Sequence, residues 1–149
     1  MDITTHAQPD KLEKYSFLWS EVRLIIAAVA LLIGGIPPIL FLTPVALYGL
    51  AAILLKLAWI ISGAASAYLL YRWYTGGQKV FGGNDKKDMI AFFVSVVSGL
   101  NLGIVGLLGT NIGMSILSNY LVFVITAVIY LVAAGYLFKR WKANGRRVF

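Results

Sequence analysis

Apolar residues gather into four long runs that are separated by shorter polar or charged segments, over residues 22–42, 47–71, 89–108 and 116–138. A helix needs about 20 residues to cross the apolar core of a bilayer at about 1.5 Å per residue. Each run reaches about that length. The pattern therefore predicts an all-α, polytopic membrane protein with four transmembrane helices.

A polar segment, residues 1–21, precedes the first run. Leu12, Tyr15, Trp19 and Val22 recur there at helical spacing behind Asp10, which is a suitable N-cap. This spacing predicts a short interfacial helix that leads into the first span. A cleavable secretory signal would need a basic start and a short apolar core, so none is expected from this polar opening.

The charged residues set the expected orientation of the spans. The connections "TPVA" and "GTNIGMS" carry no charge, whereas the middle loop and the C-terminal tail are rich in lysine and arginine. Basic residues in short loops favour the cytoplasmic side. We therefore expect both termini and the middle loop in the cytoplasm, with two tight hairpin turns outside. The same bias accounts for much of the net charge of +7.

The segment "AYLLYRWYTGGQKVF" (67–81) is echoed by "GYLFKRWKANGRRVF" (135–149). The identical positions are Tyr68 and Tyr136, Leu69 and Leu137, Arg72 and Arg140, Trp73 and Trp141, Gly77 and Gly145, Val80 and Val148, and Phe81 and Phe149. The match predicts a duplicated two-helix hairpin, with repeats at 22–81 and 82–149. The alternative is that two helix ends have converged on the same interface chemistry, which would not explain the matched glycine, valine and phenylalanine.

Small residues and prolines mark places where the helices would pack closely or bend. Ser95, Gly99 and Gly103 on the third span, and Gly63 and Ala67 on the second, have the spacing that lets helix backbones approach. Such contacts would lie within the bundle or between subunits. In "GGIPP", the prolines 37 and 38 predict that the first span kinks or stops. The kink or stop is predicted at Pro37 and Pro38.

Lys56 is the residue that most invites a functional interpretation from sequence, because it lies about 13 Å into the predicted second span. All the carboxylates are placed at or near the cytoplasmic side, so Lys56 has no predicted internal ion-pair partner. It would face a polar cavity near Asn101 or Tyr130, a lipid phosphate or a neighbouring subunit. A lysine that merely snorkels to the interface is the plain alternative.

Enzyme chemistry is not expected from this sequence. The chain has no cysteine, its one histidine is His6, and no pair of carboxylates falls within a predicted span. We therefore predict no catalytic residues, no metal ligands and no cofactor apart from structural phospholipid. The absence of an acid within the predicted spans also argues against a proton-coupled carrier.

A hydrophobic helix, the loop "YRWYTGGQKVFGGNDKKD" and a second helix rich in glycine and serine occupy about residues 47–108. This arrangement resembles the pilins of type IV secretion and conjugation systems, including the archaeal DNA-import type. The resemblance implies a pilus subunit that self-assembles with bound lipid around a lumen for DNA, with contacts to other secretion-machine subunits. Four predicted spans instead of two depart from that family. The residues that would contact lipid or a polyanion are Lys56, Arg72, Lys79, Lys86 and Lys87.

Two other classes of membrane protein remain open from sequence. One is a subunit of a small oligomeric channel, holin-like pore or transporter, built around the intramembrane polar residues. The other is an accessory scaffold that packs against a larger membrane machine. The composition, 60% hydrophobic and 13% charged, favours self-assembly in a membrane over catalysis but does not choose among these classes.

Overall fold

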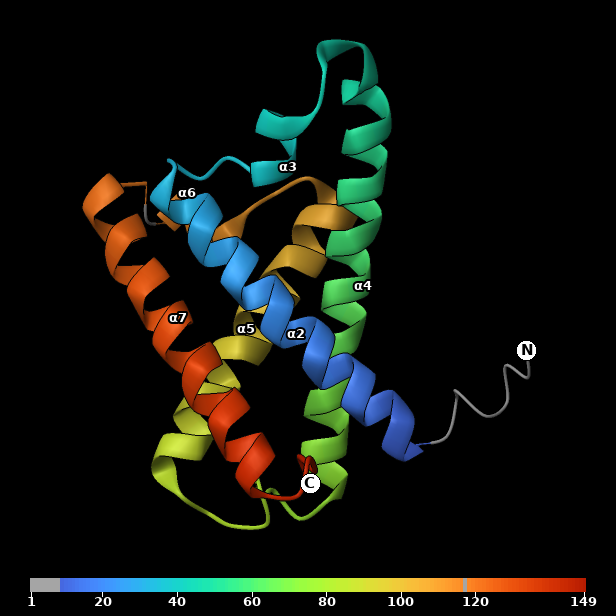
Figure 1. Ribbon diagram of the computed structural model, residues 1–149, viewed down its shortest axis with the longest axis vertical. Helices are drawn as coiled ribbons and strands as arrows, with labels where there is room; N and C mark the ends of the chain where they lie inside the picture. The colour runs from blue at the N-terminus through green and yellow to red at the C-terminus, as the bar shows by residue number, and fades with distance from the viewer. Residues whose placement is uncertain (1–8, 117) are drawn as a thin grey trace.

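The computed structural model describes residues 9–116 and 118–149, and it is a bundle of helices (Figure 1). Within these residues no β-strand forms, and one isolated β-bridge pairs Val80 with Gly83. The elements in chain order are α2 (Pro9–Leu32), α3 (Pro38–Leu42), the 3₁₀ helix η1 (Val45–Leu47), α4 (Tyr48–Thr75), α5 (Lys86–Leu108), α6 (Ile112–Ile116) and α7 (Tyr120–Ala143).

The helices α2, α4, α5 and α7 are each long and apolar enough to cross a membrane. The prediction of an all-α protein with four such helices is therefore confirmed. Large apolar side chains on the outside of the bundle, among them Leu50, Ile53 and Leu57, are more than half exposed. Such an outer surface suits contact with lipid chains better than contact with water.

The first long helix differs from the prediction. We expected a span over residues 22–42 behind a separate interfacial helix, but α2 is continuous from Pro9 to Leu32. It stops there because Gly34 and Gly35 both adopt left-handed backbone (φ +91° and +84°). Pro37 and Pro38 follow this break and start α3 instead of kinking α2. The membrane-length segment of α2 therefore includes charged residues that the sequence pattern had placed outside it.

The connections between the long helices also differ from the tight turns that were expected. The first connection contains α3 and η1, and the second contains α6. At the other end of the bundle, α4 continues to Thr75 and α7 to Ala143, beyond the predicted ends of their apolar runs. Arg72, predicted in the middle loop, and Arg140, predicted in the C-terminal tail, are thus within continuous helices.

Glycines bring α4 and α5 into close contact. A Cβ atom added at Gly63 would lie 2.6 Å from the Gly103 Cα atom, and one added at Gly99 would collide with the Ser66 side chain. Any side chain larger than hydrogen would separate these helices. Ala67 was predicted to share this contact but is exposed, because the helix turns Ser66 toward α5 in its place.

The two echoed segments have matching local structure where they leave α4 and α7. Gly77 and Gly145 are both left-handed, at φ +84° and +66°. The amide of Gln78 donates to the Trp73 carbonyl and that of Arg146 to the Trp141 carbonyl, each at 2.9 Å. The two segments also meet, since the Phe81 amide donates to the Val148 carbonyl at 2.7 Å. The origin of this likeness by duplication stays a prediction.

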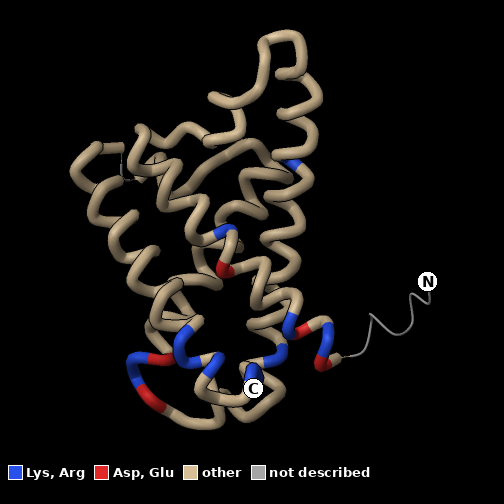
Figure 2. The backbone as a smooth tube through the Cα atoms, in the orientation of Figure 1, with Lys and Arg blue, Asp and Glu red and all other residues tan. Residues whose placement is uncertain are grey.

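Most charged residues lie at one end of the bundle (Figure 2). We call it the charged end; it is formed by residues 9–14, 72–88 and 139–149. The opposite end, called the hairpin end, is formed by residues 33–47 and 109–116. The charged end is therefore polar, whereas the rest of the bundle is mainly apolar and carries few charged residues.

Candidate functional site

Ion pairs tie the helices together at the charged end. Arg72 of α4 contacts Glu13 of α2 at 2.9 Å. Arg140 of α7 holds Asp88 of α5 through two hydrogen bonds of 2.8 and 2.7 Å. Glu13 also accepts hydrogen bonds from the amides of Val148 and Phe149 at 3.3 Å each. Arg72, predicted from the family resemblance to contact a polyanion, thus has a structural role here.

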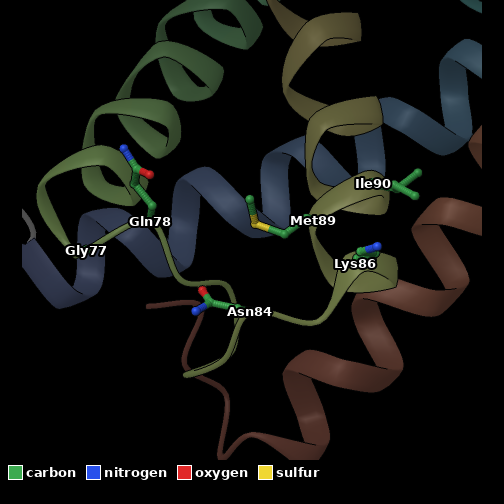
Figure 3. A pocket seen from close by; sticks show the side chains of 6 residues that line it. All are labelled: Gly77, Gln78, Asn84, Lys86, Met89 and Ile90. Atoms are coloured by element: carbon green, nitrogen blue, oxygen red, sulfur yellow. The ribbon is translucent and has the colours of Figure 1, made fainter.

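The loop between α4 and α5 and the first turns of α5 form an open hollow of about 610 Å³. Figure 3 shows the Met89 side chain pointing from α5 toward the side where Gln78 and Asn84 lie, with Lys86 and Ile90 on the other side of the α5 turn. Lys79, Lys86 and Lys87 are exposed. The polar side chains that line it, Gln78, Asn84 and Lys86, make no hydrogen bond within the described part of the chain, so the hollow makes a poor site for a specific ligand.

A buried arginine marks the middle of the bundle. Arg23 lies on α2 and is only 6% exposed. Its Nη1 donates to Ser98 Oγ at 2.9 Å, and its Nη2 donates to the Ser95 carbonyl at 2.8 Å, both on α5. Its Nε has no hydrogen-bond partner in the part of the chain that the structure describes. The guanidinium is therefore held by α5, and three hydrogen bonds, including a longer one from Nη2 to Ser95 Oγ at 3.4 Å, use three of its five N–H donors.

Glu21 lies close to Arg23 along α2 and is also buried, at 5% exposure. Neither of its carboxylate oxygens has a hydrogen-bond partner among the described residues. From the sequence we predicted this acid at the cytoplasmic border, outside the spans. The lack of an acid within the spans was then the reason for not expecting a proton-coupled carrier. That premise is wrong, because α2 starts at Pro9 and puts Glu21 near its middle.

A cavity of about 680 Å³ lies between α2, α4, α5 and α7 and reaches the hairpin end. Its walls are mainly apolar, with Ile26, Leu54 and Val105 among them, and Arg23 is the only charged residue among those described that line it. The volume is within the range of small-molecule sites, about 300–1,000 Å³. An apolar chamber with one fixed cation can hold a mostly apolar molecule and orient its polar end.

The intramembrane polar residues predicted from sequence fall around this cavity. Tyr130 and Asn101 both line it. The Asn101 side chain donates to Asn111 Oδ1 at 3.0 Å and accepts from the Gly113 amide at 3.3 Å, which closes α5 onto the α6 connection. Lys56, in contrast, is exposed on the outer face of α4 and does not line the cavity. The cation that meets the cavity is Arg23.

Comparison with models of protein families, with characterised proteins and with solved structures finds no match to this chain. The candidate site therefore rests on geometry alone. It consists of the cavity, the Arg23 guanidinium and the two α5 serines that fix it, Ser95 and Ser98. The predicted helix-packing residues Gly99 and Gly103 lie beside these serines and let α4 close the chamber.

Sequence reasoning missed both Arg23 and Glu21. The signal that would have found them is the amphipathic spacing of residues 12–22 running without a break into the first apolar run. Had the two been joined into one helix, its charged residues would have fallen at membrane depth. The serines of α5, on a face turned toward that helix, would then have been the natural partners for an arginine.

Proposed function

We propose that this protein is a membrane-embedded carrier or channel-type subunit that binds a small, mostly apolar molecule in the cavity between its four long helices. The observation that supports the proposal is the cavity of about 680 Å³ with apolar walls and a single fixed cation. Sites of this kind between the helices of a bundle commonly hold ligands. The proposed topology has the charged end, with its lysines and arginines, in the cytoplasm.

The cost of burying Arg23 supports a functional role for the chamber. An arginine in a membrane-spanning helix costs at least about 2.5 kcal/mol on insertion scales. Here the chain also leaves Glu21 without a hydrogen-bond partner among the described residues. Leucines at positions 21 and 23 could be buried at a lower cost in free energy. The presence of Glu21 and Arg23 there is therefore best explained by the binding of a ligand in the cavity.

Filling the cavity should abolish ligand binding without unfolding the bundle. Ala58 lines the cavity, whereas Ala52 is exposed on the outer face of the same helix. We expect Ala58→Phe to reduce saturable photolabelling by a diazirine-bearing medium-chain fatty alcohol by about tenfold or more, because the ring occupies the site. Ala52→Phe should label like the wild type.

The measurement is mass-spectrometric mapping of the labelled residues in detergent, with and without an excess of unlabelled alcohol. Competable labels on cavity residues that are not exposed on the outside, such as Leu102 or Val105, would support the proposal. Labels confined to outward residues, with equal yields in both variants, would refute it.

A pilin-like subunit is a second proposal, favoured by the exposure of Lys79, Lys86 and Lys87 on the loop that resembles that family. In this case copies of the chain would polymerise with structural phospholipid, and the loop would face DNA in a lumen. Electron microscopy of sheared extracellular material and of solubilised membranes tests it. Filaments that contain this chain are expected; closed particles confined to the membrane would contradict it.

A further inference from the structure

The charge in the cavity indicates which end of a ligand Arg23 would hold. Within the described residues the ion pairs are Glu13 with Arg72 and Asp88 with Arg140, and Arg23 takes part in neither. Glu21 is near along the helix but does not line the cavity. Among the described residues no acidic side chain lines the cavity beside Arg23, and Glu21, which interacts with Arg23 electrostatically, forms no ion pair with it.

The bonding of Arg23 leaves it able to accept a further partner. Ser98 Oγ, the Ser95 carbonyl and Ser95 Oγ are neutral acceptors, so the guanidinium keeps its net charge, and these three contacts use only three of its five N–H groups. Arginine presents planar donors that match carboxylate and phosphate oxygens. In an apolar setting such a charge-assisted contact is stronger than it would be in water.

The rest of the cavity suits an alkyl or similar apolar chain. Ile26, Leu54, Leu55, Leu102 and Val105 contribute to its walls. A molecule with several anionic groups would meet no second cation among the described lining residues. A wholly apolar molecule would offer no hydrogen-bond acceptor to the buried guanidinium. The two features together favour a ligand with an apolar body and one anionic group.

We propose that the cavity binds a single-chain anionic amphiphile whose carboxylate or phosphate group is held by Arg23. This inference rests on the proposed function, because it names the ligand class of the same cavity. It also moves the contact with an anionic group from Lys56, where the sequence placed it, to a buried residue on another helix. Lys56 is exposed and can serve as the matched cation for comparison.

The test compares two photoprobes on the full-length protein: a diazirine-bearing medium-chain fatty acid and the corresponding fatty alcohol. We expect the wild type to bind the acid at least about tenfold more tightly than the alcohol. Arg23→Gln should remove this difference, Arg23→Lys should keep part of it, and Lys56→Gln should keep all of it. An alkyl phosphate should compete with the acid probe as a second anion of the same class.

Each contrary outcome has a distinct meaning. The inference would be overturned if the wild type bound acid and alcohol equally well. It would also be overturned if the preference for the acid survived in Arg23→Gln or disappeared in Lys56→Gln. In each of these cases the proposed cavity binding stands. Failure of both probes to label the cavity would overturn the proposed function itself. Competition by phosphatidylglycerol as strong as that by the free acid would assign the site to bilayer lipid and overturn the single-chain ligand. If Arg23→Gln does not fold, the two wild-type affinities and Arg23→Lys still decide.

Discussion

The Gly103→Ala variant should lose about 2–3 kcal/mol of unfolding free energy, a large effect for one added methyl group. The new Cβ atom would lie 2.7 Å from the Cα atom of Gly63. A side chain could rotate away from such a collision, but a backbone atom cannot. The two helices must therefore move apart, and the contacts along α4 and α5, including those beside Ser66 and Gly99, would loosen together.

Gly135→Ala is the matched control for this prediction. Gly135 also lies within a long helix, α7, but a Cβ atom there would meet nothing within 4 Å. Alanine favours helix by up to about 1 kcal/mol over glycine, so this variant should be as stable as the wild type or slightly more so. Unfolding in mixed micelles by titration with SDS, followed by far-UV circular dichroism, measures both. Equal curves for the two variants would show that α4 and α5 do not touch at Gly103.

The number and approximate position of the long helices could be predicted because apolar length is a local property of the sequence. The face that each helix turns inward could not, since the lipid-facing and bundle-facing sides of α4 are both apolar. Gly63 was found because small residues have one common use between membrane helices. Ala67 was chosen wrongly over Ser66, because the spacing rule cannot tell which side of Gly63 the partner helix occupies.

The candidate site was harder to predict than the fold because it depends on partners distant in sequence. Lys56 attracted attention as a cation inside an apolar run, but its exposure on the bundle surface allows it to snorkel. Arg23 was overlooked at the edge of its apolar run, because the charged residues just before it are typical of a segment that is exposed to water. Only the packing of α2 against α5 supplies the Ser95 and Ser98 acceptors that make its burial tolerable. The cavity depends on how far apart the packed helices lie, and no local sequence pattern determines that spacing.

The acidic residues at the charged end show the same dependence on tertiary partners. Asp88 has no accessible surface, although it lies in the first turn of α5, where an acid is expected to face solvent. It accepts hydrogen bonds from Tyr136 Oη at 2.7 Å and from Arg140 at 2.8 and 2.7 Å. Tyr136 and Arg140 match Tyr68 and Arg72 in the echoed segments, and the sequence alone indicated no partner for them. In the structure they bind α5 to α7.

Asp88→Asn should therefore destabilise the protein by about 2–3 kcal/mol. Asparagine keeps the shape of the side chain but removes the charge, and its amide places N–H donors against the donors of Arg140 and Tyr136. The loss should be smaller than the roughly 3–5 kcal/mol typical of breaking a fully buried pair. The reason is that the Arg140 side chain is 39% exposed, so its guanidinium can turn to water.

Asp85→Asn provides the matched control, with the same chemical change three positions earlier. Asp85 caps α5 by accepting the Lys87 amide at 2.7 Å, and asparagine caps a helix about as well as aspartate. Its unfolding free energy should stay within about 0.5 kcal/mol of the wild type. SDS titration of both variants in mixed micelles is the measurement. A loss in Asp88→Asn no greater than that in Asp85→Asn would mean that the contact between α5 and α7 does not depend on the ion pair, and that apolar packing beside it holds these helices together.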